Sequence, residues 1–333
     1  MGDYRRLCIT RTGRRLIRLA AAILFFFAAA ARAQDRSEGM GFLSGAGDSA
    51  RYSFTLNPAE PGAPKMAWHH ASGSMAVLQS GSDTWSISGR ASELELSRSP
   101  VVPQTALVVP AKLWDIQAGG AFSRRTGDRR DWGVNAGLGS ASDEPFRSIH
   151  ETEARAAAYR EFPSRERNSW MLFLAYSNNR SFLNNIPFPG AAYVFREPIP
   201  GLQASVGLPF ARVSYQPGKD WRASFSIFGP NNISVEGARR LVSESWVYSR
   251  FERSPSQWLR ADREQRTDRL VFDHQEARVG LRGVAGKGFS ADISAGRDFR
   301  RRFYESREAS RSGVPKAELS DAWTGSLRLS WRR

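Results

Sequence analysis

Cysteine is nearly absent from this chain of 333 residues, which has one, Cys8, and only four histidines. Cys8 precedes the longest apolar run of the sequence, so nothing beyond that run can form a disulfide or a thiolate metal site. A phosphate-binding glycine loop of the Walker type and a glycine-framed serine nucleophile are also missing. These absences argue against thiol chemistry and against the common nucleotide-binding and serine-hydrolase motifs.

Apolar runs long enough to cross a membrane as a helix are lacking too. The longest, from Leu19 to Ala31, is shorter than the about 20 residues that a spanning helix needs. Arginines precede it, and it ends in the small residue Ala31, with the small residue Ala33 two positions later, a pattern typical of a cleaved leader. We therefore predict a signal peptide over residues 1–33, cut after Ala33, and export of the mature chain. An uncleaved anchor helix is the alternative.

Acidic residues are fewer than basic ones, 33 against 48, which gives a net charge of +15. The predicted leader holds seven arginines and one aspartate, and subtracting its +6 leaves +9 for residues 34–333. A basic chain often binds nucleic acid, but an exported one meets lipid phosphates and small anions instead. We expect no nucleic-acid partner, and a basic solvated surface without a partner is the alternative.

Helical periodicity is scarce after residue 33, and alternation of strand length takes its place. In WTGSLRLSWRR, residues 323–333, apolar residues and glycine alternate with small or hydrogen-bonding ones. The remaining segments with this pattern or with strand-like composition are 50–57, 114–122, 132–139, 152–162, 202–208, 221–228, 277–284 and 289–296. The sequence therefore predicts an all-β protein.

The face opposite the apolar one indicates whether these segments belong to a soluble or a membrane protein. It carries mostly Ser, Gly, Asn, Thr and Arg, whereas a soluble sandwich would show a richly charged outer face. The apolar face carries aromatic residues near strand ends: Trp132, Trp221, Trp323 and Trp331. Apolar residues toward lipid, polar residues toward a lumen and aromatic girdles characterise a transmembrane barrel, and only a closed barrel leaves no unpaired backbone in hydrocarbon. We predict a closed antiparallel barrel of about 12–16 strands, in which the last strand pairs with the first.

Loop lengths give an independent check, because such barrels have short periplasmic turns and longer outside loops. Long connections are predicted outside at 140–150, 177–190, 259–269 and 299–321, and short turns inside at 125–130, 163–168, 217–220 and 285–288. The assignments of inside and outside made from the two ends of the chain agree only if the chain reverses tightly near Pro209. Residues 34–49, rich in Gly and Ser, are predicted to be a flexible periplasmic lead-in, and residues 50–333 a single barrel.

Three stretches carry a resemblance to a known family: VVPAKLWDIQAGGAFSRRTGDRRDWGVNAGLGSASDEPF, RNSWMLFLAYSNNRSFLNNIPFPGAAYVF and WLRADREQRTDRL. They resemble an uncharacterised family of bacterial outer-membrane β-barrel proteins, a domain of unknown function described as porin-like. The resemblance covers about residues 64–333, and its most specific element is the SNN…FLNNIP…PG run. It implies the same compartment and architecture, and it carries over no catalytic or ligand-binding residue.

Metal ligands are scarce in the predicted wall. The neighbours His69 and His70 point to opposite faces of an extended strand, so both cannot ligate one metal ion. We predict no metal site and no cofactor.

Catalytic groups are equally few. His274 lies beside Asp273 and Glu276 and could act as a base with an orienting carboxylate, although a strand residue near the barrel rim is the simpler interpretation. Ser148 and His150 lie in a predicted loop without the context of a nucleophile. We predict no enzymatic activity and no catalytic residue, with an outer-membrane hydrolase as the less favoured alternative.

An asparagine-rich run, NNRSFLNNIPFPG, is predicted to lie in an outside loop. It offers paired donors and acceptors from Asn178, Asn179, Asn184 and Asn185. Such a loop could fold inward and narrow a pore or bind a polar solute. We favour a compact turn whose Asn and Pro residues satisfy the backbone.

Arginines on the predicted inner face are the clearest functional signal. By alternation they are Arg222, Arg278, Arg282 and Arg328. A lumen lined by them would favour anions. Alternatively, they pair across the interior and plug it, with the partners Glu153, Glu276, Asp292 and Asp298.

The sequence thus predicts a protein of the cell outer membrane, a passive porin-like channel for small polar or anionic solutes. The alternatives are a plugged barrel with a structural or lipopolysaccharide-contacting role, the hydrolase, and a soluble periplasmic β-protein. Expected partners are outer-membrane lipid, lipopolysaccharide, the barrel assembly machinery and small anionic solutes.

Overall fold

The structure is a computed structural model that describes residues 48–333 except 59, 62, 106, 129, 166, 181–182, 197–198, 287 and 308–312. The predicted signal peptide, with Ala31 and Ala33, and residues 34–47 of the predicted lead-in lie outside the described residues. No helix in the described ranges is long and apolar enough to cross a membrane.

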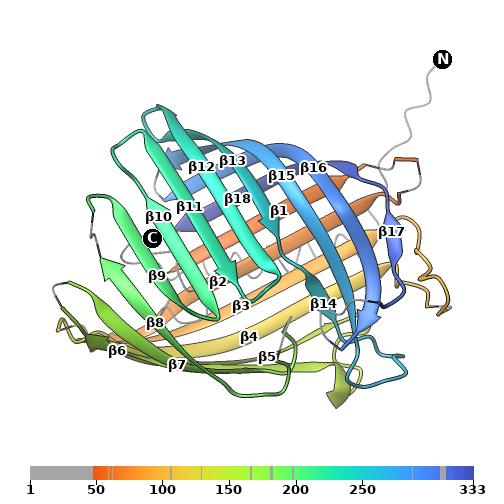
Figure 1. The fold of residues 1–333 in the computed structure, drawn as a ribbon, viewed down its shortest axis with the longest axis horizontal. Coiled ribbons are helices and arrows are strands. Elements are labelled where there is room, and N and C mark those ends of the chain that lie inside the picture. The colour runs from red at the N-terminus through yellow and green to blue at the C-terminus, as the bar shows by residue number, and fades with distance from the viewer. Residues whose placement is uncertain are drawn as a thin grey trace.

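Strands make up almost all of the described chain (Figure 1). The first half contains β1 (Ser49–Asn57), β2 (Met66–Ser80), β3 (Asp83–Leu96), β4 (Lys112–Arg124), β5 (Trp132–Ser142), the short 3-10 helix η1 (Ile149–Glu151), β6 (Thr152–Pro163), β7 (Ser169–Ser177), β8 (Phe188–Arg196) and β9 (Leu202–Leu208). The second half contains β10 (Phe210–Tyr215), β11 (Trp221–Phe228), β12 (Asn232–Val242), β13 (Ser245–Arg253), β14 (Ser256–Trp258), β15 (Arg269–Gly286), β16 (Phe289–Ser306), β17 (Ala317–Leu319) and β18 (Ala322–Arg332). The predicted all-β class is confirmed.

Every strand pairs antiparallel with its neighbours, and the sheet closes on itself. The closing pair is β1 with β18, in a register that sets Tyr52 opposite Leu329. The short strand β14 pairs with β15 beyond the end of β13, and β17 pairs with β16 ahead of β18. Eighteen strands less these two extensions leave sixteen positions around the wall. The structure confirms a closed barrel at the upper end of the predicted strand range, with the last strand joined to the first.

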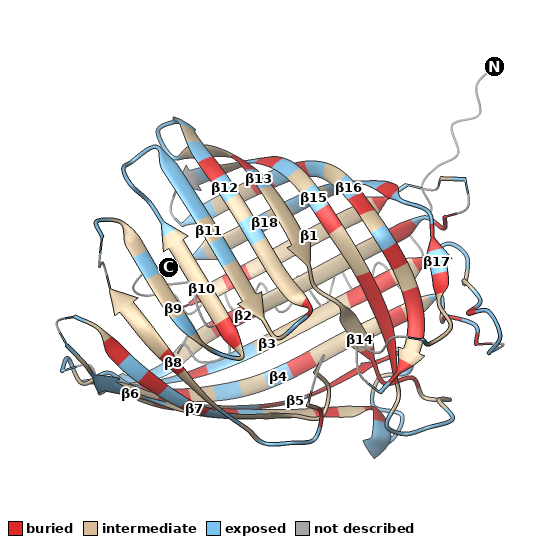
Figure 2. Ribbon diagram, in the orientation of Figure 1, coloured by how far each residue is buried: buried red, intermediate tan, exposed pale blue. Residues whose placement is uncertain are grey.

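The two faces of the wall differ as the alternation predicts. On β18, Trp323 and Leu329 are 59% and 48% exposed, whereas Thr324 between them is 5% exposed. Residues paired across neighbouring strands share a face, so the register carries this assignment around the wall. Figure 2 shows the resulting alternation of exposed and covered positions along the strands. Apolar residues outside and hydrogen-bonding residues inside are the inverse of a soluble fold.

Aromatic residues mark both edges of the apolar outer face. Trp132, Trp221 and Trp331 lie at strand ends on one side, and Trp323 lies at the other end of β18. Eight residues separate Trp323 from Trp331, which at about 3.3 Å per residue and a tilt of about 40° spans about 20 Å of height. This height suits the apolar band of a transmembrane barrel, about 25 Å tall.

Loops and turns segregate to opposite ends. The long-loop end has the connections 58–65, 97–111, 143–151, 178–187, 259–268 and 307–316, together with the short connections 209 and 229–231. The short-turn end has 81–82, 125–131, 164–168, 197–201, 216–220, 243–244 and 287–288. A tight reversal at Pro209 joins β9 to β10, as the loop pattern requires. The expectation for 299–321 was wrong in part, because β16 continues to Ser306 and β17 lies within that segment.

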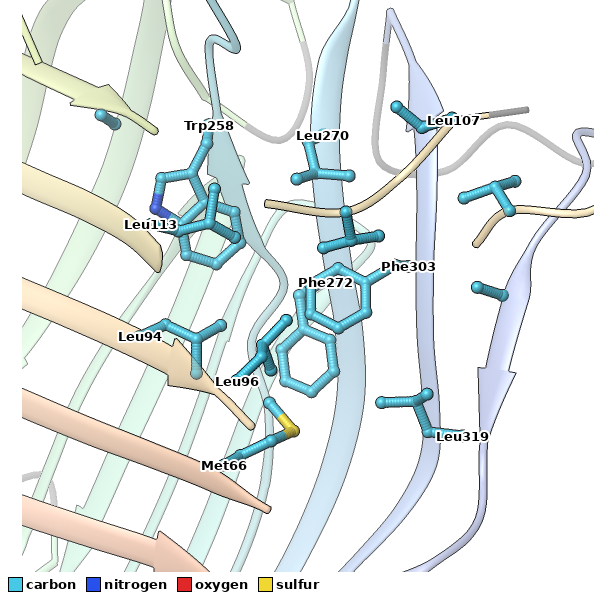
Figure 3. Close-up of a cluster of buried hydrophobic side chains, with 14 residues drawn as sticks. Met66, Leu94, Leu96, Leu107, Leu113, Trp258, Leu270, Phe272, Phe303 and Leu319 are labelled. Atoms are coloured by element: carbon cyan, nitrogen blue, oxygen red, sulfur yellow. The ribbon is translucent and has the colours of Figure 1, made fainter. Parts of the chain in front are cut away.

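A buried apolar cluster, the mouth core, fills one side of the long-loop end (Figure 3). It is built from the ends of β2 to β5 and of β14 to β17, and from the connection between β3 and β4. Its residues are Met66, Leu94, Leu96, Val102, Leu107, Val109, Leu113, Ala141, Trp258, Leu270, Phe272, Phe303, Ala317 and Leu319. The inward Trp68 packs against it, with its ring 6.1 Å from Trp258 and 6.3 Å from Phe272. At this place the inner face is apolar and filled, although the sequence pattern predicted a polar lumen.

Candidate functional site on the inner face of the barrel

The four arginines predicted from alternation lie on one face of the wall, opposite inward residues of the neighbouring strands. Arg278 is opposite Gly296, Arg282 is opposite Asp292, and Arg328 is opposite Asp292 and Ser53. Arg222 on β11 is opposite Ala238 of β12. Three of the four therefore lie on β15 and β18, and Arg222 lies several strands away.

Carboxylates accompany the arginines of β15. Arg282 binds Asp292 at 3.0 Å and Glu236 at 3.3 Å, and Arg278 pairs with Glu276. The Tyr248 hydroxyl donates to Asp292 at 2.6 Å. These bonds run along the wall between nearby strands, so they fix side chains against the wall instead of bridging the lumen. We call the inner face of β12, β13, β15 and β16 the paired sector.

A smaller charged group lies on β3, β4 and β6. Arg90 binds Asp115 at 2.9 Å, and Gln117 donates to Glu153 at 2.8 Å. Of the acids predicted as lumen partners, Glu153 therefore meets an amide, and Asp298 accepts from Asn57 and lies 3.5 Å from His274. Glu276 and Asp292 are the two that pair with the predicted arginines.

Arg222 and Arg328 differ from the other two predicted arginines. In the part of the chain that the structure describes, neither forms an ion pair. In that part of the chain, their charges are therefore not neutralised by a paired carboxylate.

The inner face is not polar throughout, which corrects the sequence-based expectation. Apolar residues from β6, β7, β8, β10 and β11 face inward and pack together as what we call the apolar strip. Its residues are Ala157, Tyr159, Met171, Phe173, Ala175, Phe188, Ala192, Val194, Phe210 and Phe228. The Phe173 and Phe210 rings are 5.7 Å apart, and Phe228 is opposite Phe210. Strand β7 is thus apolar on both faces, with Leu172 and Leu174 exposed on its outer one.

Inward glycines let large side chains lie flat against the wall. The Phe173 ring covers Gly190 of the neighbouring strand, where an added Cβ would collide with it. The Tyr248 ring covers Gly280 in the same way, at 2.7 Å from the position of a Cβ. Both rings would have to project into the lumen if these positions carried side chains.

The asparagine-rich loop forms a compact turn that also reaches across the mouth. The Asn178 side chain binds the backbone of Thr152 and Ala154, and the Asn184 side chain accepts from the Arg180 backbone. Arg269, at the start of β15, donates to the Asn178 carbonyl across the mouth.

The two remaining asparagines of this loop have different contacts. Asn179 is 3.5 Å from Glu153 on the inner face, and the Asn185 backbone donates to Ser177. Asn178 and Asn184 thus form the side-chain hydrogen bonds to the backbone that the favoured prediction expected. Asn179 differs, because its side-chain amide contacts Glu153 on the inner wall.

A second contact crosses the mouth between the 143–151 and 259–268 connections. Arg263 lies 3.6 Å from Glu151 and donates to the His150 carbonyl at 2.7 Å. Burial lowers the pKa of the Arg263 guanidinium against the attraction of Glu151. The loops on this side are therefore held together by a buried ion pair.

The histidines show no catalytic arrangement with the serine considered from sequence. The Ser148 hydroxyl accepts from the His150 backbone as the cap of η1, so its oxygen is used in the turn. His274 stacks on Phe272, and His69 contacts Tyr52. No group of three or more His, Cys, Asp or Glu side chains suited to a metal ion occurs among the described residues.

Sequence reasoning missed the apolar strip and two inward acids, Glu236, which binds Arg282, and Glu252, which lies 3.6 Å from Arg250. The strip left one signal, the run MLFLAY at 171–176, which is too apolar for a strand with one polar face. Glu236 and Glu252 follow the alternation of β12 and β13, and those strands were not recognised from sequence.

No protein family model and no curated protein sequence matches this chain. Among solved structures, an outer membrane channel from Pseudomonas putida F1 is 8% identical with a TM-score of 0.34, over 90% of this chain and 99% of that one. OmpT of Vibrio cholerae is 8% identical with a TM-score of 0.33, over 86% and 96%. The translocator domain of autotransporter NalP from Neisseria meningitidis is 10% identical with a TM-score of 0.28, over 95% and 98%. These values are too low to support an argument about function, and the family resemblance stays a prediction.

Proposed function

We propose that the protein is an outer-membrane channel through which small polar or anionic solutes diffuse passively. The closed barrel with its apolar outer face and aromatic edges is the architecture that suits a bilayer. The observation that carries the channel proposal is that inner charged side chains bind along the wall, as Arg282 does with Asp292 and Glu236. Arg222 and Arg328 supply the positive charge that favours anions. The proposal includes no catalytic step and no cofactor.

Planar-bilayer recording of the purified mature protein tests this proposal. In a KCl gradient we expect steady single-channel current with a reversal potential that indicates anion preference. Replacing both Arg222 and Arg328 by Gln should reduce the chloride to potassium permeability ratio severalfold, because two fixed positive charges leave the lumen. A matched control is Arg239→Gln on the outer face, where Arg239 lies over the Trp221 ring at 5.2 Å. Silence from a correctly folded barrel would overturn the channel.

A plugged barrel with a structural role is the second candidate, and the mouth core favours it. That core fills one side of the long-loop end, and the Arg263–Glu151 and Arg269–Asn178 contacts cross the same end. If the barrel is plugged, we propose that its outer face performs the function by binding lipopolysaccharide. Asp273 points outward and accepts from both Arg253 and Arg302, at 3.1 Å and 2.5 Å, so the cluster has a net positive charge suited to a lipopolysaccharide phosphate.

Bilayer recording also decides between these two candidates. A plugged barrel should give no current in the wild type, and lipopolysaccharide retained through purification should fall in an Arg253→Gln, Arg302→Gln variant. Retention unchanged by that variant would remove the support for the lipopolysaccharide contact.

A further inference from the structure

The barrel wall is low on one side, at the hairpin of β9 and β10. These strands have 7 and 6 residues, whereas a strand that spans a bilayer needs about 9–11. The two are joined at Pro209 alone, and the next connection at the same end, 229–231, is also short. Figure 1 shows β9, β10 and β11 ending near the middle of the molecule, while β15 and β16 continue to the end that carries β17. We call β9, Pro209 and β10 the low wall.

The missing height lies at the long-loop end. At the short-turn end, Tyr215 and Trp221 are 39% and 57% exposed on the outer face, so β10 and β11 reach the aromatic edge there. From Leu202 to Leu208, the outward residues at the two ends of β9, six residues at about 3.3 Å each and a tilt of about 40° span about 15 Å of height. The apolar band of a transmembrane barrel is about 25 Å tall. Lipid chains at the long-loop end, in the outer leaflet of the predicted orientation, therefore rise above the edge of the low wall by about 10 Å.

The edge of the low wall joins two apolar surfaces. Leu208 is 75% exposed on the outer face, and Phe210, on the other side of the turn, faces inward and packs in the apolar strip. Phe210 is itself buried, but Phe228 opposite it is half-buried, so the strip keeps accessible apolar surface. The two turns at this edge, 207–210 and 228–231, contain no charged residue. Between the outer face and the strip, the edge therefore presents no charged side chain of its own.

The long-loop end is less open from above. The Leu259 backbone donates to the Ala141 carbonyl at 2.6 Å, so the chain after β14 crosses the mouth to β5. Arg269 of β15 donates to the Asn178 carbonyl, which holds the 178–187 connection toward β15, across the mouth. With the mouth core filling the opposite side, the apolar strip is reached most directly from the side, over the low wall.

We infer that the low wall is a lateral portal, over which an acyl chain of the outer leaflet reaches the apolar strip. Such a portal goes beyond the proposed channel and depends only on the barrel lying in a bilayer. A bilayer taller than the wall beside it must thin, at a cost that grows with the mismatch. A chain that bends over the edge onto the strip relieves this mismatch and keeps its contacts apolar, so no apolar surface has to be hydrated.

A full-height wall does not offer this route. Strands β5, β12 and β18 have 11 residues each. Behind β12 the inner face carries the ion pairs of the paired sector, such as Arg282 with Glu236. A chain there would have to cross a hydrogen-bonded wall and remove water from charged groups, which is costly.

Single cysteines can report the portal, because the sequence has no cysteine after Cys8. Ser226→Cys on β11 and Ser326→Cys on β18 both place a thiol on the inner face at a half-buried serine, the first one two residues from Phe228. The full mature protein, labelled with bimane, is reconstituted in vesicles of phosphatidylcholine whose acyl chains carry bromine. We expect quenching of bimane by these chains to be severalfold stronger at position 226 than at position 326, where the wall is tall. Equal quenching at the two positions would overturn the portal.

The part played by the apolar strip is tested in the Ser226→Cys background. Phe188→Ser with Phe228→Ser removes two half-buried rings of the strip and should lower the quenching to the level of position 326. Phe225→Leu is the matched control and should leave it unchanged, since Phe225 lies on β11 but faces outward and is 39% exposed. The heat-modifiable gel shift of a folded barrel checks each variant. Quenching unaltered by the double substitution would mean that no chain lies on the strip, and would overturn the proposal.

A bimane label at Leu208→Cys, on the outer face, identifies what covers the edge. The portal requires strong quenching there as well as at position 226. Quenching at position 208 alone would mean that the bilayer thins beside the low wall. A disulfide between two copies of this variant, with no quenching at position 208, would mean that a second copy covers the edge, and either result overturns the portal.

Ion current has no part in this readout, so the two proposals can fail separately. Quenching at position 226 without single-channel current would remove the proposed channel and leave the portal. Current without quenching at position 226 would remove the portal and leave the channel.

Discussion

The inner wall has two regions that accommodate inward side chains differently: the paired sector, and the inner face of β7 to β11, which we call the acid-free sector because these strands contain no Asp or Glu. On β12 to β16, arginines and carboxylates neutralise one another between neighbouring strands, as Arg282, Asp292 and Glu236 do. On β7 to β11, the Phe173 ring lies against Gly190, and the arginines have no acidic residue on their own strands. The comparison teaches that a barrel interior can be divided into a side held by ion pairs between neighbouring strands and a side whose strands carry apolar surface and arginine without acidic residues.

The largest expected effect comes from filling the wall beneath a ring of the acid-free sector. Gly190→Val should force the Phe173 ring off the wall and into the lumen, at a cost of about 3 kcal/mol in the free energy of unfolding. Single-channel conductance of the proposed channel should fall together with stability. Urea unfolding in detergent or lipid, followed by tryptophan fluorescence, measures the first quantity.

Gly325→Val is the control for this substitution. Gly325 lies on the outer face of β18, and nothing lies within 4 Å of the place where a Cβ would be. Equal losses in the two variants would mean that the close approach of Phe173 to Gly190 has no special role.

A smaller loss of stability is expected in the paired sector. Asp292→Ala removes the acceptor of Tyr248 and one of the two carboxylates bound to Arg282. Because Arg282 keeps Glu236, we expect about 2 kcal/mol, less than the loss for a buried ion left without any partner. The same variant should raise anion preference, since one negative charge leaves the lumen.

The outward pair of Arg297 and Asp321, 3.9 Å apart and about half exposed, gives the matching control. Asp321→Ala should change the free energy of unfolding by less than about 1 kcal/mol. Should both aspartate variants unfold at the same urea concentration as the wild type, the ion pairs of the paired sector would not be structural.

The smallest effect on stability should follow from adding an acid to the sector that has none. Ser224→Glu places a carboxylate on the inner face of β11, opposite Ser214 of β10 and Glu236 of β12. We expect a change in stability of less than about 1 kcal/mol, because the position is on a water-exposed lumen wall, but a clear loss of anion preference. Ser224→Gln, which has the same size without charge, should keep the preference of the wild type, and a loss in both would assign the effect to size.

Much of the fold followed from alternation alone. The face on which Trp323 and Leu329 lie, the pairing of the last strand with the first and the reversal at Pro209 all depend on local pattern and loop length. The end of β16 did not, because the ladder shifts register near Arg300, whose φ is +54°. That irregularity interrupts the alternation, and the segment beyond it is rich in charged residues. From sequence, this segment is therefore predicted to be a loop.

The candidate site was predictable only where each residue could be assigned from its own strand. Arg222 and Arg328 follow from the alternation of β11 and β18. The partnership of Arg282 with Glu236 joins strands 46 residues apart, and the apolar strip joins rings from five strands. Such groupings depend on register and on the wall strands between them, and neither is contained in a single alternating segment.

The mouth core has a geometric consequence for traffic through the proposed channel. It occupies the long-loop end beside β2 to β5 and β15 to β17, and the strands opposite that side are the short β9 and β10, of 7 and 6 residues. An entrance at this end would thus be displaced from the barrel axis, toward the side of the short strands β9 and β10. The half-buried Phe228, which faces inward at the end of β11, lies on that side of the mouth.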